Sequence, residues 1–600
     1  MVTVAKPIPM PRVRRTRARP GMPSAAPILR DPEFETPPAI LEVPRVATGR
    51  VADTAFLFVA SLALRLVQLD HTPHMDELFH VFAARSVLAD GTLAIAGGEP
   101  YERARGFTYL VAGMFRLFGE SLVAARVPSV VFGSLMVPIL YLWVRANSNR
   151  AAGWLAAVLL CLYPGSLYLS QLARFYAGHG LLFLVTSIAV WKLVDSEPRG
   201  VVRIGYFAVA IVCLAVALHL QITTLMGLAG IAVAAFVVAL PGMVSAVRRS
   251  RLARIGAVVA LAALGLLLAR ALDPARAQSI LSVYRFSDLW ARDGAEVFQF
   301  YHYHLLGDYP VLWLLLPFLV LASATVAPRF TLYSAIAFSI IFLGHSFAAW
   351  KSARYIFYGM PFFFALAGVG ISALWPRMVA IARTALQRLS GGVLAPAVLR
   401  IGAIALTCAG LAFAAAGGSA FRLTWRMLVV PDSEWQLELQ YRGEPDWRAV
   451  AAALRPQLDE AQVVISSADL KPIYYLGRLD IVLSATELVR NSNGSLPEFT
   501  PTDFSMRPAV STVASLDLVM RCTASGVVLV ERAHWRNPWA VSPTVADFIE
   551  TRMTRIDVPP GSWIQAFRWS TPEPAADPAC AVLPVPGTGE DGVSVIPSAT

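Results

Sequence analysis

Two adjacent carboxylates, Asp76 and Glu77, are the side chains of this sequence whose types and spacing best suit a chemical reaction. They stand in HTPHMDELFHVFAARSVLADG, after an apolar run and before a stretch that reads as an amphipathic helix. Carboxylates at a membrane surface are costly unless they are hydrated or paired. One of them could act as a general base toward an incoming hydroxyl or amine. The alternative is that both are solvated loop residues, or that one caps the N-terminus of the helix.

Several basic residues fall in connections between apolar runs that are predicted to face outward. Guanidinium and ammonium groups there could stabilise a departing phosphate by charge and hydrogen bonds. The alternative is a cation at a helix end whose charged group reaches the membrane interface. The candidates for binding a donor phosphate are Arg103, Arg105, Arg174, Lys351 and Arg354.

Histidines could add metal binding to this chemistry. His71, His74 and His80 flank the acidic pair, and His302 and His304 stand in FQFYHYHLLGDYP. Imidazoles and carboxylates together can hold zinc or another divalent ion, but this spacing matches no closed metal-site signature. The residues considered for a supporting or metal-binding role are Glu102, His80, His302 and His304; no cofactor is certain, and a divalent metal stays an open alternative.

The composition indicates what must position these residues. Of 600 residues, 56% are hydrophobic and only 15% are charged, whereas soluble chains are about one quarter charged. Most of the protein is therefore expected to lie in a lipid bilayer. The net charge of +11 does not indicate nucleic-acid binding, because the basic residues cluster at the ends of apolar runs and form no face interleaved with aromatics.

A bilayer-spanning helix needs about twenty mostly apolar residues. The run 106–118 is too short to span and is predicted to be an interfacial helix. Eleven spans are predicted near 53–70, 121–144, 151–170, 177–194, 204–221, 223–241, 255–272, 309–327, 330–347, 354–375 and 398–419.

The basic residues also predict the orientation in the membrane. Connections rich in arginine and lysine alternate with connections that are poor in them, and cytoplasmic loops carry such an excess. This places the N-terminus in the cytoplasm and the C-terminal part on the opposite side of the membrane. The predicted parts are a disordered basic tail (1–50), a membrane domain (51–420) with its first outward loop at 71–120, an α/β domain (421–575) and a flexible tail (576–600).

The C-terminal part changes in character. Asp446 is predicted to cap a helix over DWRAVAAALRPQL, and VADFIETRM also reads as helical. Strand candidates are VVISS, YYLGRLDIVLS, SGVVLVER and WIQAFRW, and no nucleotide-binding motif accompanies them. If this part lies outside the cytoplasm, Cys522 and Cys580 could form a disulfide.

The segment LRLVQLDHTPHMDELFHVFAARSVLADG, followed by FGESLVAARVPSVVFGSLMVPILYLW, resembles the GT-C superfamily of polytopic glycosyltransferases. It is most similar to the protein O-mannosyltransferase-like branch and the bacterial lipid A aminoarabinose transferases. The likeness extends to SQLARFYA and KSARYIFYGMPFF and covers most of residues 50–420. The acidic pair is its most specific signal.

The resemblance implies a polytopic α-helical protein of a bacterial inner membrane, with a C-terminal extracytoplasmic α/β domain in the periplasm. It implies an enzyme that moves a sugar from a polyprenyl-phosphate-linked donor to a lipid, protein or polysaccharide acceptor at the outer membrane face, with inversion at the sugar carbon. Asp76 matches the family's base, and Arg174, Lys351 and Arg354 match positions near the donor phosphate. Glu102-Arg103 departs from the Glu-Lys-Pro-Pro of aminoarabinose transferases, which leaves the sugar and that family's metal site open.

Two other classes of protein fit part of the pattern. A transporter or lipid flippase for envelope polysaccharide also has many spans, but it would place charges inside them, whereas here the candidates concentrate in outward loops. The second alternative is a non-catalytic scaffold for envelope assembly that displays the α/β domain. The predicted partners are thus a lipid-linked sugar, an acceptor and membrane lipid, without nucleic acid.

Overall fold

The computed structural model describes residues 45–196, 198–251, 255, 298–348, 351–430, 444–489, 496–571 and 580. The candidate site lies within one compact unit, Ala52–Thr600. The predicted span 255–272 lies outside the described residues, apart from Ile255. Residues 1–44 also lie outside them, as does the predicted tail apart from Cys580.

The described part contains seven helices that are long and apolar enough to cross a membrane, or eight if the bent pair α5 (Arg150–Cys161) and α6 (Pro164–Ser170) forms one span. At about 1.5 Å per residue, a helix of twenty residues matches the hydrocarbon core. The seven are α4 (Leu122–Asn147), α7 (Tyr176–Asp195), α8 (Gly200–Leu220), α9 (Thr224–Arg249), α15 (Pro328–Phe347), the stretch Ala353–Leu389 and α18 (Pro396–Ala416).

These helices coincide with eight of the predicted spans, and two other predictions differ from the structure. The run near 53–70 belongs to α1, which already begins at Arg45 and ends at Leu66. The run 309–327 is broken into α13 (Pro310–Leu314) and α14 (Leu316–Val326), because Pro317 near the start of α14 cannot continue a preceding helix. The stretch from Ala353 comprises α16 (Ala353–Ile356), the short η1 (Phe357–Gly359) and α17 (Met360–Leu389).

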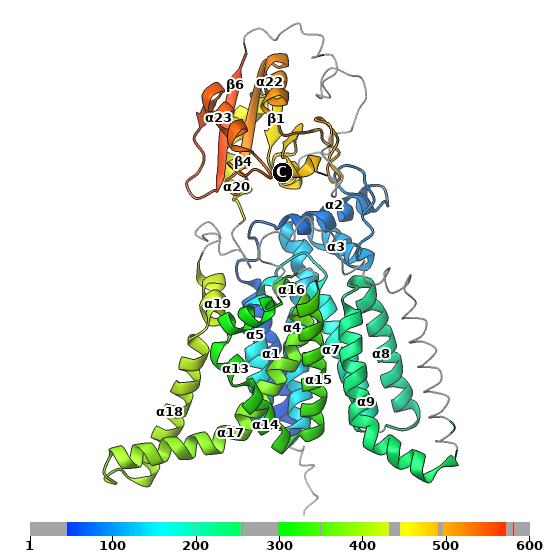
Figure 1. Cartoon of the computed structure of the whole chain (residues 1–600), viewed down its shortest axis with the longest axis vertical. Helices are drawn as coiled ribbons and strands as arrows, with labels where there is room; N and C mark the ends of the chain where they lie inside the picture. The colour runs from blue at the N-terminus through cyan, green and yellow to red at the C-terminus, as the bar shows by residue number, and fades with distance from the viewer. Residues whose placement is uncertain are drawn as a thin grey trace, which may run out of the picture. The chain divides into compact units, whose positions relative to one another are not determined.

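Close packing fixes the helices around the site. α5 lies along α17, and α9 lies along α15 (Figure 1). Gly133 of α4 faces Ser170 of α6 so closely that a Cβ would stand 1.9 Å from the serine Oγ. Any side chain at position 133 would therefore push α4 away from α6. Two further helices, α12 (Phe300–Asp308) and α19 (Ser419–Val429), contact each other.

The loop after α1 carries two helices. α2 (Met75–Ala89) is a helix as predicted, but it is not amphipathic, because the consecutive residues Leu78 to Ala84 are all buried and cover every face of the helix. α3 (Arg105–Phe118) is the short helix predicted over 106–118. Its buried residues recur at helical spacing, as in an amphipathic helix with one apolar face.

The C-terminal part is an α/β domain, as predicted. Its six-stranded sheet has the order β3-β2-β1-β4-β6-β5; β3, β2, β1 and β4 are parallel, and β6 is antiparallel to both of its neighbours. β1 is buried along its whole length, which is typical of a parallel strand covered on both faces. The strands are β1 (Val463–Ser466), β2 (Ile481–Leu483), β3 (Ala509–Val510), β4 (Ser525–Glu531), β5 (Thr554–Ile556) and β6 (Ile564–Ser570).

The two helices predicted over DWRAVAAALRPQL and VADFIETRM are present in this domain, and one strand prediction is wrong. Asp446 caps the first helix, since its Oδ1 accepts from the Ala449 amide at 3.0 Å. The first part of YYLGRLDIVLS is wrong as a strand, because it ends a helix that closes at Gly477 with a left-handed φ of 71°. The helices are α20 (Trp447–Glu460), α21 (Leu470–Leu476), η3 (Thr486–Leu488), α22 (Val513–Cys522) and α23 (Pro543–Arg552).

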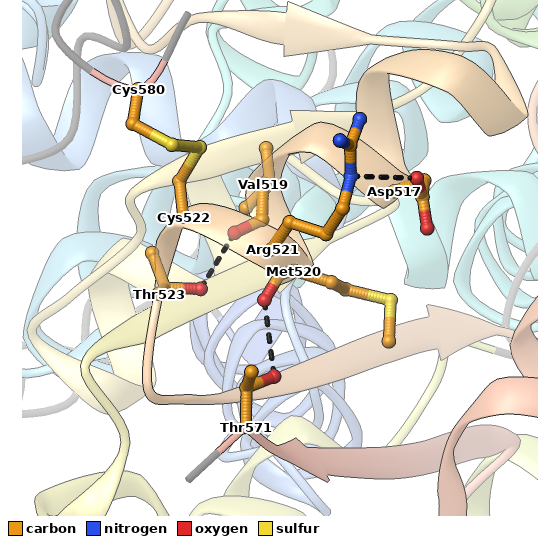
Figure 2. The surroundings of a disulfide bond; sticks show 8 residues. All are labelled: Asp517, Val519, Met520, Arg521, Cys522, Thr523, Thr571 and Cys580. Atoms are coloured by element: carbon orange, nitrogen blue, oxygen red, sulfur yellow. Dashed lines mark hydrogen bonds and ion pairs between the residues drawn. A yellow bond between two sulfur atoms is a disulfide. The ribbon is translucent and has the colours of Figure 1, made fainter. Parts of the chain in front are cut away.

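A disulfide joins Cys522 to Cys580, 58 residues apart in the sequence. Figure 2 shows Cys522 at the end of α22, where Thr523 Oγ1 donates to Val519 O at 2.7 Å. Thr571, just after β6, donates to Met520 O at 3.2 Å. The pairing that the sequence left open is therefore present, and it ties Cys580 to the folded domain.

Candidate active site

The N-terminus of α2 presents the acidic pair in its first turn. His74 is the N-cap, and its Nδ1 accepts from the Asp76 amide at 3.1 Å. Glu77 completes a capping box, since its Oε1 accepts from the His74 amide at 3.0 Å. The capping alternative thus holds for Glu77, and the side chain of Asp76 takes no part in the box.

Glu77 is fully buried in an ion pair with Arg126 of α4. Arg126 Nε lies 2.8 Å from Glu77 Oε2, and its Nη2 lies 2.8 Å from Oε1, in the forked geometry that suits a carboxylate. The Ala173 amide donates to Glu77 Oε2 at 2.7 Å. Each carboxylate oxygen therefore has two donors, which is the condition under which a buried charge is tolerated.

Arg126 also holds the loop that leads into α2. Its Nη1 donates to Leu69 O at 2.7 Å and to His71 O at 2.8 Å. One buried pair therefore joins the end of the loop, the first turn of α2, the helix α4 and the segment before Arg174. Glu77 positions its neighbours and is not exposed to react.

Asp76 lies between two arginines that are distant in sequence. Its Oδ2 is 2.9 Å from Arg354 Nη1 and 3.5 Å from Arg174 Nη2. The side chain of Asp76 is 23% exposed and that of Arg354 is 31% exposed, whereas that of Arg174 is buried at 1%. Asp76 is therefore the accessible member of the acidic pair.

The charges around Asp76 determine its ionisation. Burial alone would raise the pKa of Asp76, but Arg174, His74 and Arg354 outweigh it and hold this pKa well below its usual value. Asp76 is thus fully ionised at neutral pH. While the arginines remain in contact, it is also a weaker base than a free carboxylate.

Arg174 is held rigidly. Its Nη1 donates to Asp76 O at 2.8 Å and to the Tyr101 hydroxyl at 2.9 Å, and Ser129 Oγ donates to the Arg174 carbonyl at 2.8 Å. Its guanidinium also lies over the ring of Phe175, with 5.1 Å to the centroid. Among the described residues, the buried Nε atoms of Arg174 and Arg354 have no hydrogen-bond partner.

The other basic candidates lie differently. Arg103 is near the cluster, since its guanidinium lies 5.4 Å from the centroid of Phe175 and its Nη2 lies 3.4 Å from Gln221 Oε1. Arg105 stands 3.9 Å from Glu102, and both side chains are exposed, at 50% and 72%. Exposed pairs of this kind contribute little.

Lys351 is engaged with the end of α15. Its Nζ donates to His345 O at 3.1 Å and to Ser346 O at 2.6 Å, and it also contacts Ala348 O. A cation at the C-terminus of a helix satisfies carbonyls that have no partner within the helix. These contacts correspond to the alternative of a cation at a helix end.

The candidate histidines have different partners in the fold. His80 is fully buried, its Nδ1 lies 2.9 Å from Thr108 Oγ1, and burial together with the charges of Arg174 and Arg103 holds its pKa well below the usual value. His302 accepts from Trp313 Nε1 at 2.9 Å, and His304 Nε2 lies 3.7 Å from Asp308. Within the described part of the chain, no group of three acidic, histidine or cysteine side chains could hold a metal ion.

The structure adds two residues that the sequence did not single out. Arg126 lies inside a predicted span, and an isolated arginine in an apolar run is itself a signal of a paired or functional charge. Tyr101, which receives a hydrogen bond from Arg174, carries no such signal. The contact between Tyr101 and Arg174 is seen only in the folded structure.

No family model matches the chain, and no curated protein matches it in sequence. Solved structures do match its fold. ArnT from Cupriavidus metallidurans superposes with a TM-score of 0.54 at 14% identity in the apo state, covering 87% of this chain and 98% of the other. The undecaprenyl phosphate-bound form gives 0.52 at 14% identity over the same shares.

A second structural neighbour is the oligosaccharyltransferase AglB from Archaeoglobus fulgidus, in complex with an inhibitory peptide and a dolichol-phosphate. It matches with a TM-score of 0.51 at 12% identity and covers 85% of this chain and 73% of the other. The chain is therefore a multi-pass membrane protein with the fold of GT-C glycosyltransferases, as the resemblance in sequence predicted.

Proposed function

We propose that this protein is an integral-membrane glycosyltransferase that moves a sugar from a polyprenyl-phosphate-linked donor to an acceptor at the outer face of the cytoplasmic membrane. The observation that carries the proposal is the placement of Asp76 between Arg174 and Arg354. A carboxylate that can take a proton stands beside two guanidinium groups that can hold a phosphate. The two structural neighbours, solved with undecaprenyl phosphate and with a dolichol-phosphate, support a donor of this class.

In this proposal the residues divide the reaction between them. Asp76 removes the proton from the acceptor hydroxyl or amine as the new bond to the sugar carbon forms. Arg174 and Arg354, with Arg103 close by, stabilise the negative charge on the departing polyprenyl phosphate. Attack opposite the leaving group inverts the sugar carbon. Glu77 and Arg126 hold the base and Arg174 in place.

The direct test is donor profiling with the purified protein in lipid nanodiscs. A panel of polyprenyl-phosphate sugars is supplied with candidate acceptors, and products are identified by mass spectrometry. Formation of a new glycosidic bond supports the proposal. Movement of a lipid-linked sugar across the membrane without a new bond would indicate the transporter or flippase class instead.

Replacing Arg354 with Gln should reduce transfer by about 10- to 100-fold, mainly through a higher KM for the donor. The reason is that a charge-assisted hydrogen bond to the phosphate contributes about 1.5–3 kcal/mol. The matched control is Arg116→Gln, which removes an exposed arginine from the end of α3. Equal losses in the two variants would show that Arg354 has no special relation to the donor.

The orientation in the membrane is part of the proposal, with the N-terminus cytoplasmic and the α/β domain periplasmic. The Cys522–Cys580 disulfide supports it, because disulfides persist in oxidising compartments.

Replacing Cys522 with Ser should make Cys580 react with a membrane-impermeant maleimide in intact spheroplasts, whereas the wild type should show no reaction at this position. The double variant Cys522→Ser/Cys580→Ser retains Cys161, Cys213 and Cys408 and reports their background labelling. Labelling that appears only after lysis would place this domain in the cytoplasm.

A further inference from the structure

Asp76 is the anion that two guanidinium groups of the site share. Arg354 Nη1 lies 2.9 Å from Asp76 Oδ2, and Arg174 Nη2 lies 3.5 Å from the same oxygen. A phosphate group would seek these same donors. The base and the donor phosphate therefore have overlapping partners.

The two arginines differ in how firmly they are held. Arg174 is buried and fixed through Asp76 O, Tyr101 and the bond from Ser129 to its carbonyl. Arg354 stands on the four-residue α16 with 31% of its side chain exposed. Its Nη1 donates to Asp76 Oδ2, and its guanidinium lies over the rings of Tyr176 and Tyr355. Arg354 is therefore the one that can change partner at small cost.

Both arginines retain a donor for an anion. Their Nε atoms are buried and lack a hydrogen-bond partner among the described residues. Phosphate recognition by arginine uses two parallel N–H groups, and a buried N–H without a partner is costly. A phosphate that met these N–H groups would satisfy donors that Asp76 leaves unused.

We propose that the donor phosphate displaces Asp76 from Arg354, so that donor binding itself releases the base for the acceptor. This rests on the proposed function. Arg174 remains 3.5 Å from Asp76 and keeps it ionised, while loss of the contact with Arg354 makes the carboxylate accessible and more basic. The donor thus binds before the acceptor is activated, and the base is restrained until a phosphate is in place.

The test is a binding measurement that needs no turnover. Undecaprenyl phosphate is titrated into the purified full-length protein in nanodiscs, and the Kd is measured for wild type, Asp76→Asn, Arg354→Gln and the double variant. If Asp76 competes for Arg354, Asp76→Asn should bind roughly tenfold tighter, which corresponds to about 1.4 kcal/mol. In the Arg354→Gln background, the same change should alter Kd by less than about twofold.

A second control separates partner exchange from the loss of one negative charge. Asp90→Asn removes an exposed carboxylate at the other end of α2, about 20 Å away by helical rise, and should leave the Kd unchanged. Tightening by Asp76→Asn that is equal with and without Arg354 would overturn the exchange. Equal affinities of wild type and Asp76→Asn would also overturn it, while leaving the proposed function standing. Failure of all four proteins to bind would overturn both.

Discussion

Replacing Asp76 with Asn should reduce sugar transfer by roughly a thousandfold or more while the protein stays folded. General base catalysis by a positioned side chain contributes about 10²- to 10⁴-fold, and the amide cannot accept the proton. The fold should persist because the Asp76 side chain is partly exposed and takes no part in the capping box. Initial rates with a radiolabelled lipid-linked sugar measure the loss, and thermal unfolding in detergent measures stability.

Asp76→Glu is the informative companion to this variant. It restores a carboxylate on a longer side chain, so it should recover part of the activity that Asn loses. A fully active Asn variant would exclude Asp76 as the base. An inactive Asn variant whose melting temperature also falls strongly would show that the carboxylate is needed for the fold.

Replacing Glu77 with Ala should have the opposite character, with a destabilisation of about 3–5 kcal/mol. The change leaves the fully buried Arg126 without a counter-charge, and uncompensated buried charges cost that much. It also removes the acceptor for the amides of His74 and Ala173. The expected result is a much lower melting temperature in detergent and poor recovery of folded protein.

Glu120 supplies the matched control, because it also pairs with an arginine, Arg85, but both side chains are partly exposed. Glu120→Ala should cost no more than about 1 kcal/mol. The double variant Glu77→Met/Arg126→Met removes both buried charges and should regain much of the stability without regaining activity. A Glu77→Ala protein that melts like the wild type yet fails in transfer would identify Glu77 as a reacting group.

Which of Asp76 and Glu77 is buried and which is accessible could not be predicted from the sequence. Adjacent residues of a helix point about 100° apart, so the two side chains face different directions, but their spacing does not show which one faces inward. The burial of Glu77 depends on its ion pair with Arg126, which lies 49 residues further along the sequence. Only tertiary packing turns Glu77 toward α4.

The site depends on contacts that are even more distant in sequence. Asp76 and Arg354 are separated by 278 positions. The basic residues of the predicted outward loops suggested that some of them could contact Asp76, but not which ones. Lys351 also carries a positive charge and is only three positions away from Arg354. Its ammonium is nevertheless turned toward the carbonyls at the end of α15.

More of the fold than of the site could be predicted from the sequence, because long apolar runs and alternating patterns are local signals. The runs 121–144 and 330–347 appear as α4 and α15, and VVISS and SGVVLVER appear as β1 and β4. The strand prediction over YYLGRLDIVLS failed at its start, where tyrosines favour a strand locally but the chain completes a turn of helix before Gly477.

The cross-link between α22 and Cys580 has a practical consequence for anyone who prepares this protein. Thiol reductants such as dithiothreitol, which are routine in membrane-protein buffers, would break the bond between Cys522 and Cys580 and release Cys580 from α22. Expression should therefore direct the protein through an export route with active disulfide formation, and purification should omit reductant. Preparations that ignore this would present a chemically different C-terminal surface in every binding and transfer assay.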